Sequence, residues 1–399
     1  MLGAPPGLRQ WQGSRDTEMM STRPCTRQCL PAWWWIALLA VAACHSPTAP
    51  GSQAGPTASM LLGADISALE RIEQAGGRFR DRGAPGDAVA ILRAHGSNGF
   101  RLRLFVNPNG DEVQVNDLAY TLRMALRIKA AGSRLLLDLH YSDTWADPGH
   151  QVTPAAWAGL GYDSLEVEVE SYTAGVITDL RQAGALPDIV QIGNEIDGGI
   201  LWPLGQVSGS GFDTPEQWDH FTRLLKAGIR GVRSALGPGD SVRIMLHYSQ
   251  GASTDGTRWF FDHMDASGVP YDLIGLSYYP WWHGTLAELR ANLRATAERY
   301  GREVMVVETS YPWRAGGWEG MVSNSAAMAW PVSPQGQARF LGDVLDAVAA
   351  VPGGRGAGVV WWYPEAIQVP GLFVWGGGSL ALFDSGGEVL AAASELGAR

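Results

Sequence analysis

Hydrophobic and polar positions alternate on two length scales after Met60. Short apolar runs are followed by longer segments in which apolar residues recur at helical spacing. The short runs indicate buried parallel strands, and the longer segments indicate amphipathic helices that cover them. We expect strands at 61–64, 100–106, 135–140, 189–193, 242–247, 273–277, 304–307 and 359–362.

Helical patterns lie between these runs, and several of them end at glycine. They span residues 118–131, 165–183, 218–236, 286–300 and 337–349. Eight parallel strands joined by right-handed crossovers predict a (β/α)8 TIM barrel, an α/β fold, as one domain over residues 60–399. Such a barrel commonly takes about 250 residues or more, and its functional groups lie where the strands end.

Two of the predicted strands end in glutamates. The run at 189–193 leads into Asn194 and Glu195, and the run at 304–307 leads into Glu308. A single glutamate after a strand is more often a helix N-terminal charge or a solvated loop residue. A pair at the carboxyl ends of two strands supplies what glycoside hydrolysis needs, one group to protonate the leaving oxygen and one to attack or activate water. The pair predicts a glycosidase.

The amino-acid composition limits which ligands and cofactors the protein can be expected to bind. The formal net charge of −10 argues against nucleic acid, whose phosphates would be repelled. The chain has 17 tryptophans, whose flat faces suit sugar rings, although most will pack in the core or rim. All three cysteines, of which Cys44 is the last, precede the predicted barrel, so no disulfide and no Cys/His metal cluster is expected in it. We expect no cofactor and no required metal.

The first residues read as an export signal. Arg23 and Arg27 precede an apolar stretch at 33–43 that is too short to span a bilayer comfortably. Either Met19 or Met20 is a candidate for the true start, because the residues before them look like upstream read-through.

A cysteine closes this predicted signal segment, which we place at 1–44. The small residues before Cys44 resemble the lipobox of bacterial lipoproteins, which predicts a lipid anchor at that cysteine; the alternative is an ordinary signal peptide with an incidental cysteine. Residues 45–59, rich in Pro, Ser, Gly and Ala, predict a flexible tether. We therefore expect a cell-envelope lipoprotein at the outer membrane or cell surface, and otherwise a secreted or periplasmic protein.

Several longer segments carry a specific resemblance. From about residue 60 nearly to the end, the chain resembles the endo-β-1,4-galactanases of glycoside hydrolase family 53, which cut galactan side chains of pectin. The matching segments are 63–67 (GADIS), 101–108 (RLRLFVNP), 140–148 (HYSDTWADP), 193–196 (GNEI), 201–203 (LWP) and 306–309 (VVET). The resemblance implies a substrate of β-1,4-galactan or arabinogalactan, and we expect a monomer that meets membranes only through its lipid.

The resemblance also implies catalytic roles. It implies a retaining double displacement with Glu195 as acid/base and Glu308 as nucleophile, so Glu195 must start protonated and Glu308 ionised. A cation should flank Glu308, and Arg101 is the candidate; the alternative is a structural ion pair low in the barrel. Tyr279 resembles the tyrosine that hydrogen-bonds the nucleophile in related barrels, or is simply a packed aromatic residue.

Three further residues are candidates for the sugar-binding site. Asn194 should hold the 2-hydroxyl of the sugar beside the scissile bond, where hydrogen bonds strengthen in the transition state. His140 and His247 both end strands. A lone histidine is more often a satisfied core residue, but both lie in family-like segments, which favours a site role.

Trp145 and Trp362 are the expected stacking platforms, because a galactose ring offers an apolar face to an indole. Asp143 and Asp147 are expected either to bind hydroxyls or to cap their loop. The chain departs from the family near the eighth strand, where Trp-Tyr-Pro-Glu stands at 362–365 in place of Trp-Glu-Pro and a glycine-rich loop follows at 371–383. Some relatives carry calcium in this region, but no suitable Asp/Asn cluster is present.

The same sequence features fit two alternative functions. A related retaining barrel glycosidase, such as a mannanase or cellulase, would carry the same Asn-Glu pair and second glutamate. A surface glycan-binding lipoprotein without activity is a further alternative, and the presence of both Glu195 and Glu308 counts against it.

Overall fold

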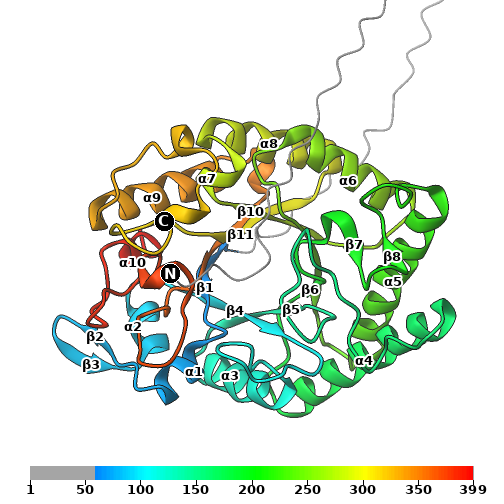
Figure 1. Ribbon diagram of the computed structural model, residues 1–399, viewed down its shortest axis with the longest axis horizontal. Coiled ribbons are helices and arrows are strands. Elements are labelled where there is room, and N and C mark those ends of the chain that lie inside the picture. Colours follow the sequence, from blue (N-terminus) through cyan, green and yellow to red (C-terminus); the bar gives the residue numbers. More distant parts are fainter. Residues whose placement is uncertain (1–58, 399) are drawn as a thin grey trace, which may run out of the picture. The chain divides into compact units, whose positions relative to one another are not determined.

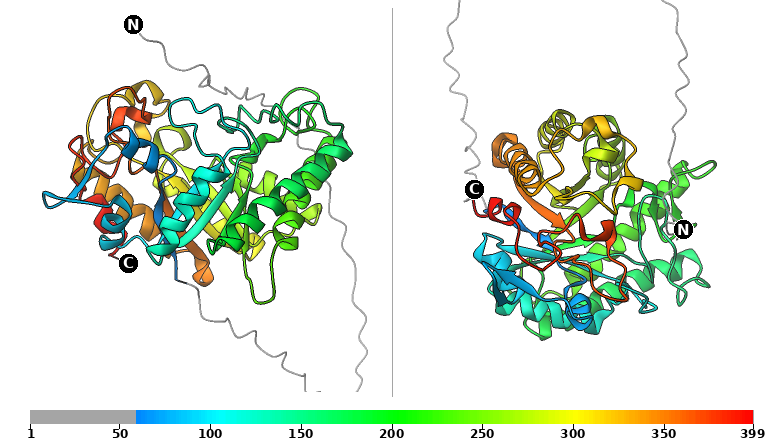
Figure 2. Two further views of the ribbon diagram at one scale, coloured as in Figure 1. Left: turned by 90° about the horizontal axis from the view of Figure 1, so that it is seen from below. Right: turned by 60° about the vertical axis from the view of Figure 1, so that its left-hand side comes forward.

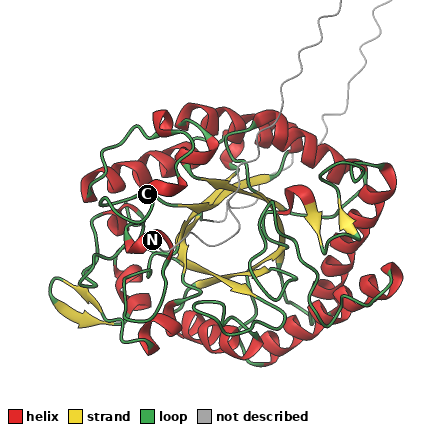
Figure 3. Cartoon of the chain, viewed as in Figure 1, coloured by secondary structure: helices red, strands yellow, loops and turns green. Residues whose placement is uncertain are grey.

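The computed structural model describes residues 59–398. The predicted signal segment, Cys44 and nearly all of the predicted tether lie outside the described residues. Figures 1 and 3 look along a ring of strands with helices around it, and Figure 2 gives two further views of the same part of the chain.

The strands form a closed, parallel eight-stranded barrel. Their order around the barrel is β1-β12-β11-β10-β9-β6-β5-β4, and β1 pairs with both β12 and β4 to close it. The bounds are β1 Leu61–Asp65, β4 Gly99–Leu104, β5 Arg134–Leu139, β6 Ile189–Ile192, β9 Arg243–Tyr248, β10 Leu273–Tyr278, β11 Glu303–Thr309 and β12 Gly356–Trp362. The predicted fold is confirmed, and each expected strand lies within a few residues of its place.

Helices between successive strands cover the barrel (Figure 3). Those expected from sequence are α3 Leu118–Ala130, α4 Tyr162–Gln182, α5 Pro215–Ser234, α8 Leu286–Tyr300 and α9 Pro334–Ala349. Those not expected are α1 Leu69–Gln74, α2 Ala88–Ala94, α6 Thr254–Ala266, α7 Pro280–His283 and α10 Ala392–Glu395. Two small hairpins, β2 Phe79–Asp81 with β3 Ala84–Gly86 and β7 Gly199–Ile200 with β8 Gly205–Gln206, complete the strands. None of the helices in the described part is long and apolar enough to cross a membrane.

Alternate residues of each strand fill the barrel, and their chemistry changes along it. Near the strand starts these positions are apolar and form one core cluster that includes Leu136 of β5 and Met245 of β9. Two residues further on, the same faces carry Asp138 and His247, both fully buried. The closed lower half is thus hydrophobic core, and the polar upper half forms the floor of a site at the carboxyl ends of the strands.

Both ends of the described chain lie at the opposite, closed end. The carbonyl oxygen of Met60 accepts hydrogen bonds from Asn98 and Arg134, which stand at the starts of β4 and β5. Near the other terminus, Ser394 Oγ lies 2.7 Å from Nδ1 of His95, in the turn that leads into β4. Neither end of the barrel chain therefore passes over the mouth.

Candidate active site

The backbone after β6 turns sharply to present Glu195. Gly193 has φ +81°, and a Cβ there would lie 2.5 Å from the Ile196 side chain, so glycine is required. Glu195 itself adopts a left-handed φ of +45°, which is uncommon for a residue with a side chain. The amide of Gln151 holds this turn by donating to the carbonyl oxygens of Asn194 (2.8 Å) and Glu195 (3.2 Å). The strained conformation is therefore fixed by a neighbouring loop.

Glu308 lies on β11 with a cation and a hydroxyl directed at its two oxygens. Arg101 Nη1 is 2.8 Å from Oε1, and the Tyr279 hydroxyl donates to Oε2 at 3.1 Å. Both contacts stabilise the ionised carboxylate. The structure thus places Arg101 and Tyr279 where the sequence suggested, against the second glutamate.

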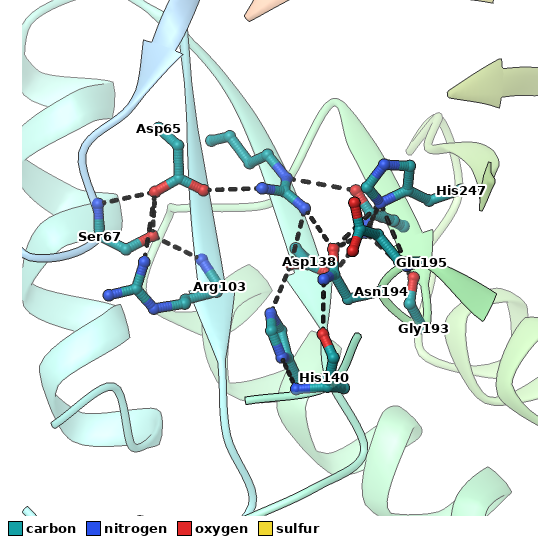
Figure 4. Close-up of polar contacts among 12 residues, drawn as sticks. Asp65, Ser67, Arg103, Asp138, His140, Gly193, Asn194, Glu195 and His247 are labelled. Atoms are coloured by element: carbon teal, nitrogen blue, oxygen red, sulfur yellow. Dashed lines mark hydrogen bonds and ion pairs between the residues drawn. The ribbon is translucent and has the colours of Figure 1, made fainter. Parts of the chain in front are cut away.

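Arg101 joins the two halves of the site, because it contacts Asp65, Asp138 and Asn194, which are labelled in Figure 4. It is fully buried, and besides Glu308 it contacts Asp65 at 3.0 Å and Asp138 at 2.8 Å. Its Nη2 also donates to Asn194 Oδ1 at 2.8 Å. One guanidinium therefore holds three carboxylates and the amide that precedes Glu195, and its planar fork suits this role.

The two glutamates have different electrostatic surroundings. Burial, followed by the charge of Glu308, raises the pKa of Glu195 well above its ordinary value. Burial also raises the pKa of Glu308, to about 7, and here Arg101 opposes the rise. The cation and the tyrosine hydroxyl therefore favour the charged form at Glu308, while Glu195 holds its proton more tightly. This is the division that an acid/base and a nucleophile need.

Asn194 and His140 are both engaged with protein groups. Asn194 Nδ2 donates to the carbonyl of Ala146 at 2.8 Å, which leaves one of its two hydrogens for a substrate hydroxyl. His140 Nε2 lies 2.9 Å from Asp138, and its Nδ1 accepts from the Ala146 amide at 3.2 Å. Burial alone would raise the pKa of Asp138, but Arg101 and then His140 lower it overall. His140 therefore supports the site through Asp138 and the 140–146 loop.

His247 has two contacts, one with the turn that carries Glu195 and one with Ser277 on β10. Its Nδ1 lies 3.3 Å from the Glu195 main-chain nitrogen, and its Nε2 lies 2.8 Å from Ser277 Oγ. The Ser277 hydroxyl in turn donates to Glu195 Oε1 at 2.7 Å. The structure places this histidine, as expected, beside the site.

The two expected stacking tryptophans lie together at the mouth. The rings of Trp145 and Trp362 are 6.2 Å apart, edge to face, and both are partly exposed. The guanidinium carbon of Arg103 lies 4.3 Å from the Trp145 ring centre and 5.6 Å from that of Trp362. This buried arginine supports both rings from beneath by cation–π contact.

The two aspartates of the 143–147 segment hold loop backbone. Asp143 accepts from the main-chain nitrogens of Asn107 and Ala155, both at 2.9 Å. Asp147 accepts from Gly149 at 2.7 Å and lies 2.9 Å from Nδ1 of His150. Of the two expected alternatives, loop capping describes the contacts of both.

The segment after β12 turns sharply and buries a glutamate against the loop after β1. Tyr363 has φ +63°, and Glu365 is buried, where its Oε1 accepts from the Ala68 amide at 2.9 Å. Burial, followed by Asp65, raises the pKa of Glu365 well above its ordinary value. Within residues 59–398, no group of His, Cys, Asp and Glu side chains is arranged to hold a metal ion.

Sequence reasoning missed five residues of this network: Asp65, Asp138, Gln151, Gln191 and Ser277. Four of them are polar residues on inward positions of strands, between apolar neighbours. That alternation was the available signal. Gln151 lies in a loop and gave none. The catalytic roles assigned to Glu195 and Glu308 stay predictions.

A closed (β/α)8 barrel with two carboxyl groups at the ends of β6 and β11, one of them paired with a buried arginine, defines a barrel glycoside hydrolase. Comparison with known proteins agrees. The model of glycosyl hydrolase family 53 matches residues 61–396. The chain belongs to that family.

Relatives of known name cover most of the barrel. A probable arabinogalactan endo-β-1,4-galactanase A from Aspergillus terreus is 38% identical and covers 78% of this chain and 87% of its own. An endo-β-1,4-galactanase from Bacillus subtilis is 32% identical over 79% of this chain and 72% of its own. Among solved structures, the family 53 catalytic domain from Ignisphaera aggregans has a TM-score of 0.78 at 32% identity and covers 86% of this chain and 97% of its own.

Proposed function

We propose that this protein is an endo-β-1,4-galactanase that cleaves the galactan backbone of type I arabinogalactan by a retaining double displacement. The observation that carries the proposal is the Arg101 ion pair on Glu308 opposite a more weakly acidic Glu195. The substrate follows from the family and from the galactanase activity in the names of its relatives.

The mechanism uses the two glutamates in sequence. In the first half-reaction the ionised Glu308 attacks the anomeric carbon while Glu195 gives its proton to the leaving glycosidic oxygen. In the second, the ionised Glu195 takes a proton from water, and that water displaces Glu308. Arg101 and Tyr279 stabilise the Glu308 carboxylate before attack and as it leaves. The remaining Nδ2 hydrogen of Asn194 is available to the 2-hydroxyl.

The test is digestion of linear β-1,4-galactan by residues 59–399, with products sized over time. We expect internal cleavage that first gives a broad range of oligosaccharides, while β-1,4-mannan and cellulose stay nearly untouched. Glu308→Gln, which keeps the side-chain volume, serves as the inactive control. Single galactose units from the start would indicate an exo-acting enzyme, cleavage of mannan or cellulose would assign another substrate, and binding without release of reducing sugar would indicate a glycan-binding protein.

We also propose that the protein is exported and anchored by lipid at Cys44. The support is the small-residue motif before Cys44 and the composition of residues 45–59. In its host, the wild-type protein should partition into the membrane fraction and a Cys44→Ala variant should carry no lipid. Equal release of both forms, unlipidated, into the soluble fraction would contradict the proposal.

A further inference from the structure

The hydroxyl of Ser277 lies between His247 and Glu195. Ser277 is fully buried on β10, in register with Glu308 on β11. Its hydroxyl donates to Glu195 Oε1 at 2.7 Å, and His247 Nε2 lies 2.8 Å from the hydroxyl oxygen of Ser277. A hydroxyl has one hydrogen to donate. Since that hydrogen goes to Glu195, the hydrogen of the second contact must come from His247.

The surroundings of His247 agree with this direction. Its Nδ1 lies 3.3 Å from the main-chain nitrogen of Glu195 and 3.1 Å from Nε2 of Gln191, both of which can only donate. Asn194 Oδ1 lies 3.0 Å from Nδ1, but both of its lone pairs already accept, from Arg101 and from Gln191. Nδ1 is therefore an acceptor, and Nε2 carries the hydrogen. Burial, followed by the charge of Arg101, lowers the pKa of His247 well below its ordinary value, which keeps the ring neutral.

We propose that Ser277 is a positioning residue for Glu195, which holds Oε1 in place and leaves Oε2 to exchange the proton with the substrate and water. Among the described residues, Oε2 of Glu195 has no hydrogen-bond partner. The two consecutive hydrogen bonds, from His247 to Ser277 and from Ser277 to Glu195, thus determine which carboxyl oxygen of Glu195 reacts. This inference rests on the proposed retaining mechanism, in which the same carboxyl acts first as acid and then as base.

Ser277 also supports the charged form of Glu195 during the second half-reaction. Three acidic groups face Glu195: Glu308 on β11, Asp197 two residues further along the chain, and Asp147 in the loop after β5. Tyr279 after β10 and the neutral His247 on β9 face it as well. These three carboxylates disfavour the charged form of Glu195, whereas the hydrogen bond from Ser277 favours it. Loss of the hydroxyl should therefore raise the pKa of Glu195 and weaken it as the carboxylate that activates water.

The first test is the pH dependence of kcat/KM on linear galactan. For Ser277→Ala we expect the alkaline limb, which reports loss of the Glu195 proton, to move up by about one pH unit and kcat to fall about ten-fold, the effect of one hydrogen bond to a charged group. Ser277→Thr keeps the hydroxyl and should keep the wild-type limb. Ser310→Ala is the matched control, because the Ser310 hydroxyl is equally buried, just after β11, but has no hydrogen-bond partner within residues 59–398.

The second test separates the two half-reactions. An aryl β-1,4-galactobioside with a strongly acidic leaving group needs no proton in the first step, so Glu195 acts on it only as the base. Ser277→Ala should lower both kcat and KM for this substrate, because the glycosyl-enzyme accumulates. A residue that only packs would instead raise KM or lower the melting temperature and leave the alkaline limb in place.

The outcomes are distinct. Coincident alkaline limbs and equal kcat for the wild type, Ser277→Ala and Ser310→Ala would overturn the inference. Should Ser277→Ala not fold, Ser277→Cys keeps similar volume with a weak donor and carries the same expectation. Failure of the wild type to cleave galactan would count against the proposed substrate instead, and the same comparison would then be made on the glycan that it does cleave.

Discussion

Replacement of Arg101 by methionine tests whether this guanidinium sets the ionisation of the nucleophile. The variant removes the contact of 2.8 Å to Glu308 Oε1 and leaves Asp65 and Asp138 without their cation. Because Arg101 lowers the pKa of Glu308, its loss raises that pKa, so the nucleophile stays protonated up to a higher pH. The acid limb of kcat/KM should therefore move upward.

The size of the shift follows from the lost contact. A hydrogen bond to a charged group contributes about 1.5–3 kcal/mol. At about 1.36 kcal/mol per unit, the acid limb should move up by roughly one to two pH units. Asp65 and Asp138, which lose their contacts to Arg101, add repulsion in the same direction. Breaking a buried ion pair also destabilises the fold by about 3–5 kcal/mol, so thermal unfolding must be measured alongside.

Arg103→Met is the matched control. Arg103 lies two residues further along β4, is equally buried and has an aspartate oxygen at 3.9 Å, but it has no ion pair with Glu308. The Arg103→Met variant should be less stable, and it should bind substrate more weakly because Trp145 loses its support. The acid limb should not move. The assay is initial-rate cleavage of linear galactan across the pH range in which each variant stays folded. An acid limb at the same pH in the wild type, Arg101→Met and Arg103→Met would refute the reasoning.

Three further predictions concern the same mouth. Glu308→Ala with azide should give the α-glycosyl azide and Glu195→Ala with an activated aryl galactobioside should give the β-azide, as read by NMR; the opposite configurations would show that the two roles are reversed. Tyr279→Phe should lower kcat/KM about ten-fold or more and raise the acid limb, because a donor to Glu308 is lost, and an unchanged pH profile would count against this. Trp145→Ala and Trp362→Ala should raise KM for galactan oligosaccharides more than they lower kcat, and calorimetric titration that gave wild-type affinity would rule out stacking on these rings.

The barrel was predictable because its strands are apolar runs of the right length. Parallel strands buried on both faces read as continuous hydrophobic segments, as at 304–307 and 135–137. α6 was missed because Gly256 and several charged residues interrupt its pattern, and Ser253, whose side chain accepts from the Gly256 amide, marks its start only in the folded chain. Tertiary packing decides such a segment more than its own sequence.

The site was only half predictable, for a geometric reason. Glu195 and Glu308 could be found because each ends a strand. Ser277 could not be found in this way, because β9 lies between β6 and β10 and only the curvature of the closed barrel brings its hydroxyl to Glu195. Asp138 likewise reads as an isolated polar residue in an apolar strand. Polar residues on alternate positions in the last half of a strand are the signal to use in such barrels.

The position of the chain ends bears on how this enzyme can be immobilised. Met60 and Ser394 both lie at the closed end of the barrel, against the starts of β4 and β5 and the turn before β4. A resin, a fluorescent label or a fused binding module coupled directly beside residue 60 or residue 394 is therefore joined on the side away from the two glutamates. A long polymer can then enter the mouth without having to pass between the enzyme and its support.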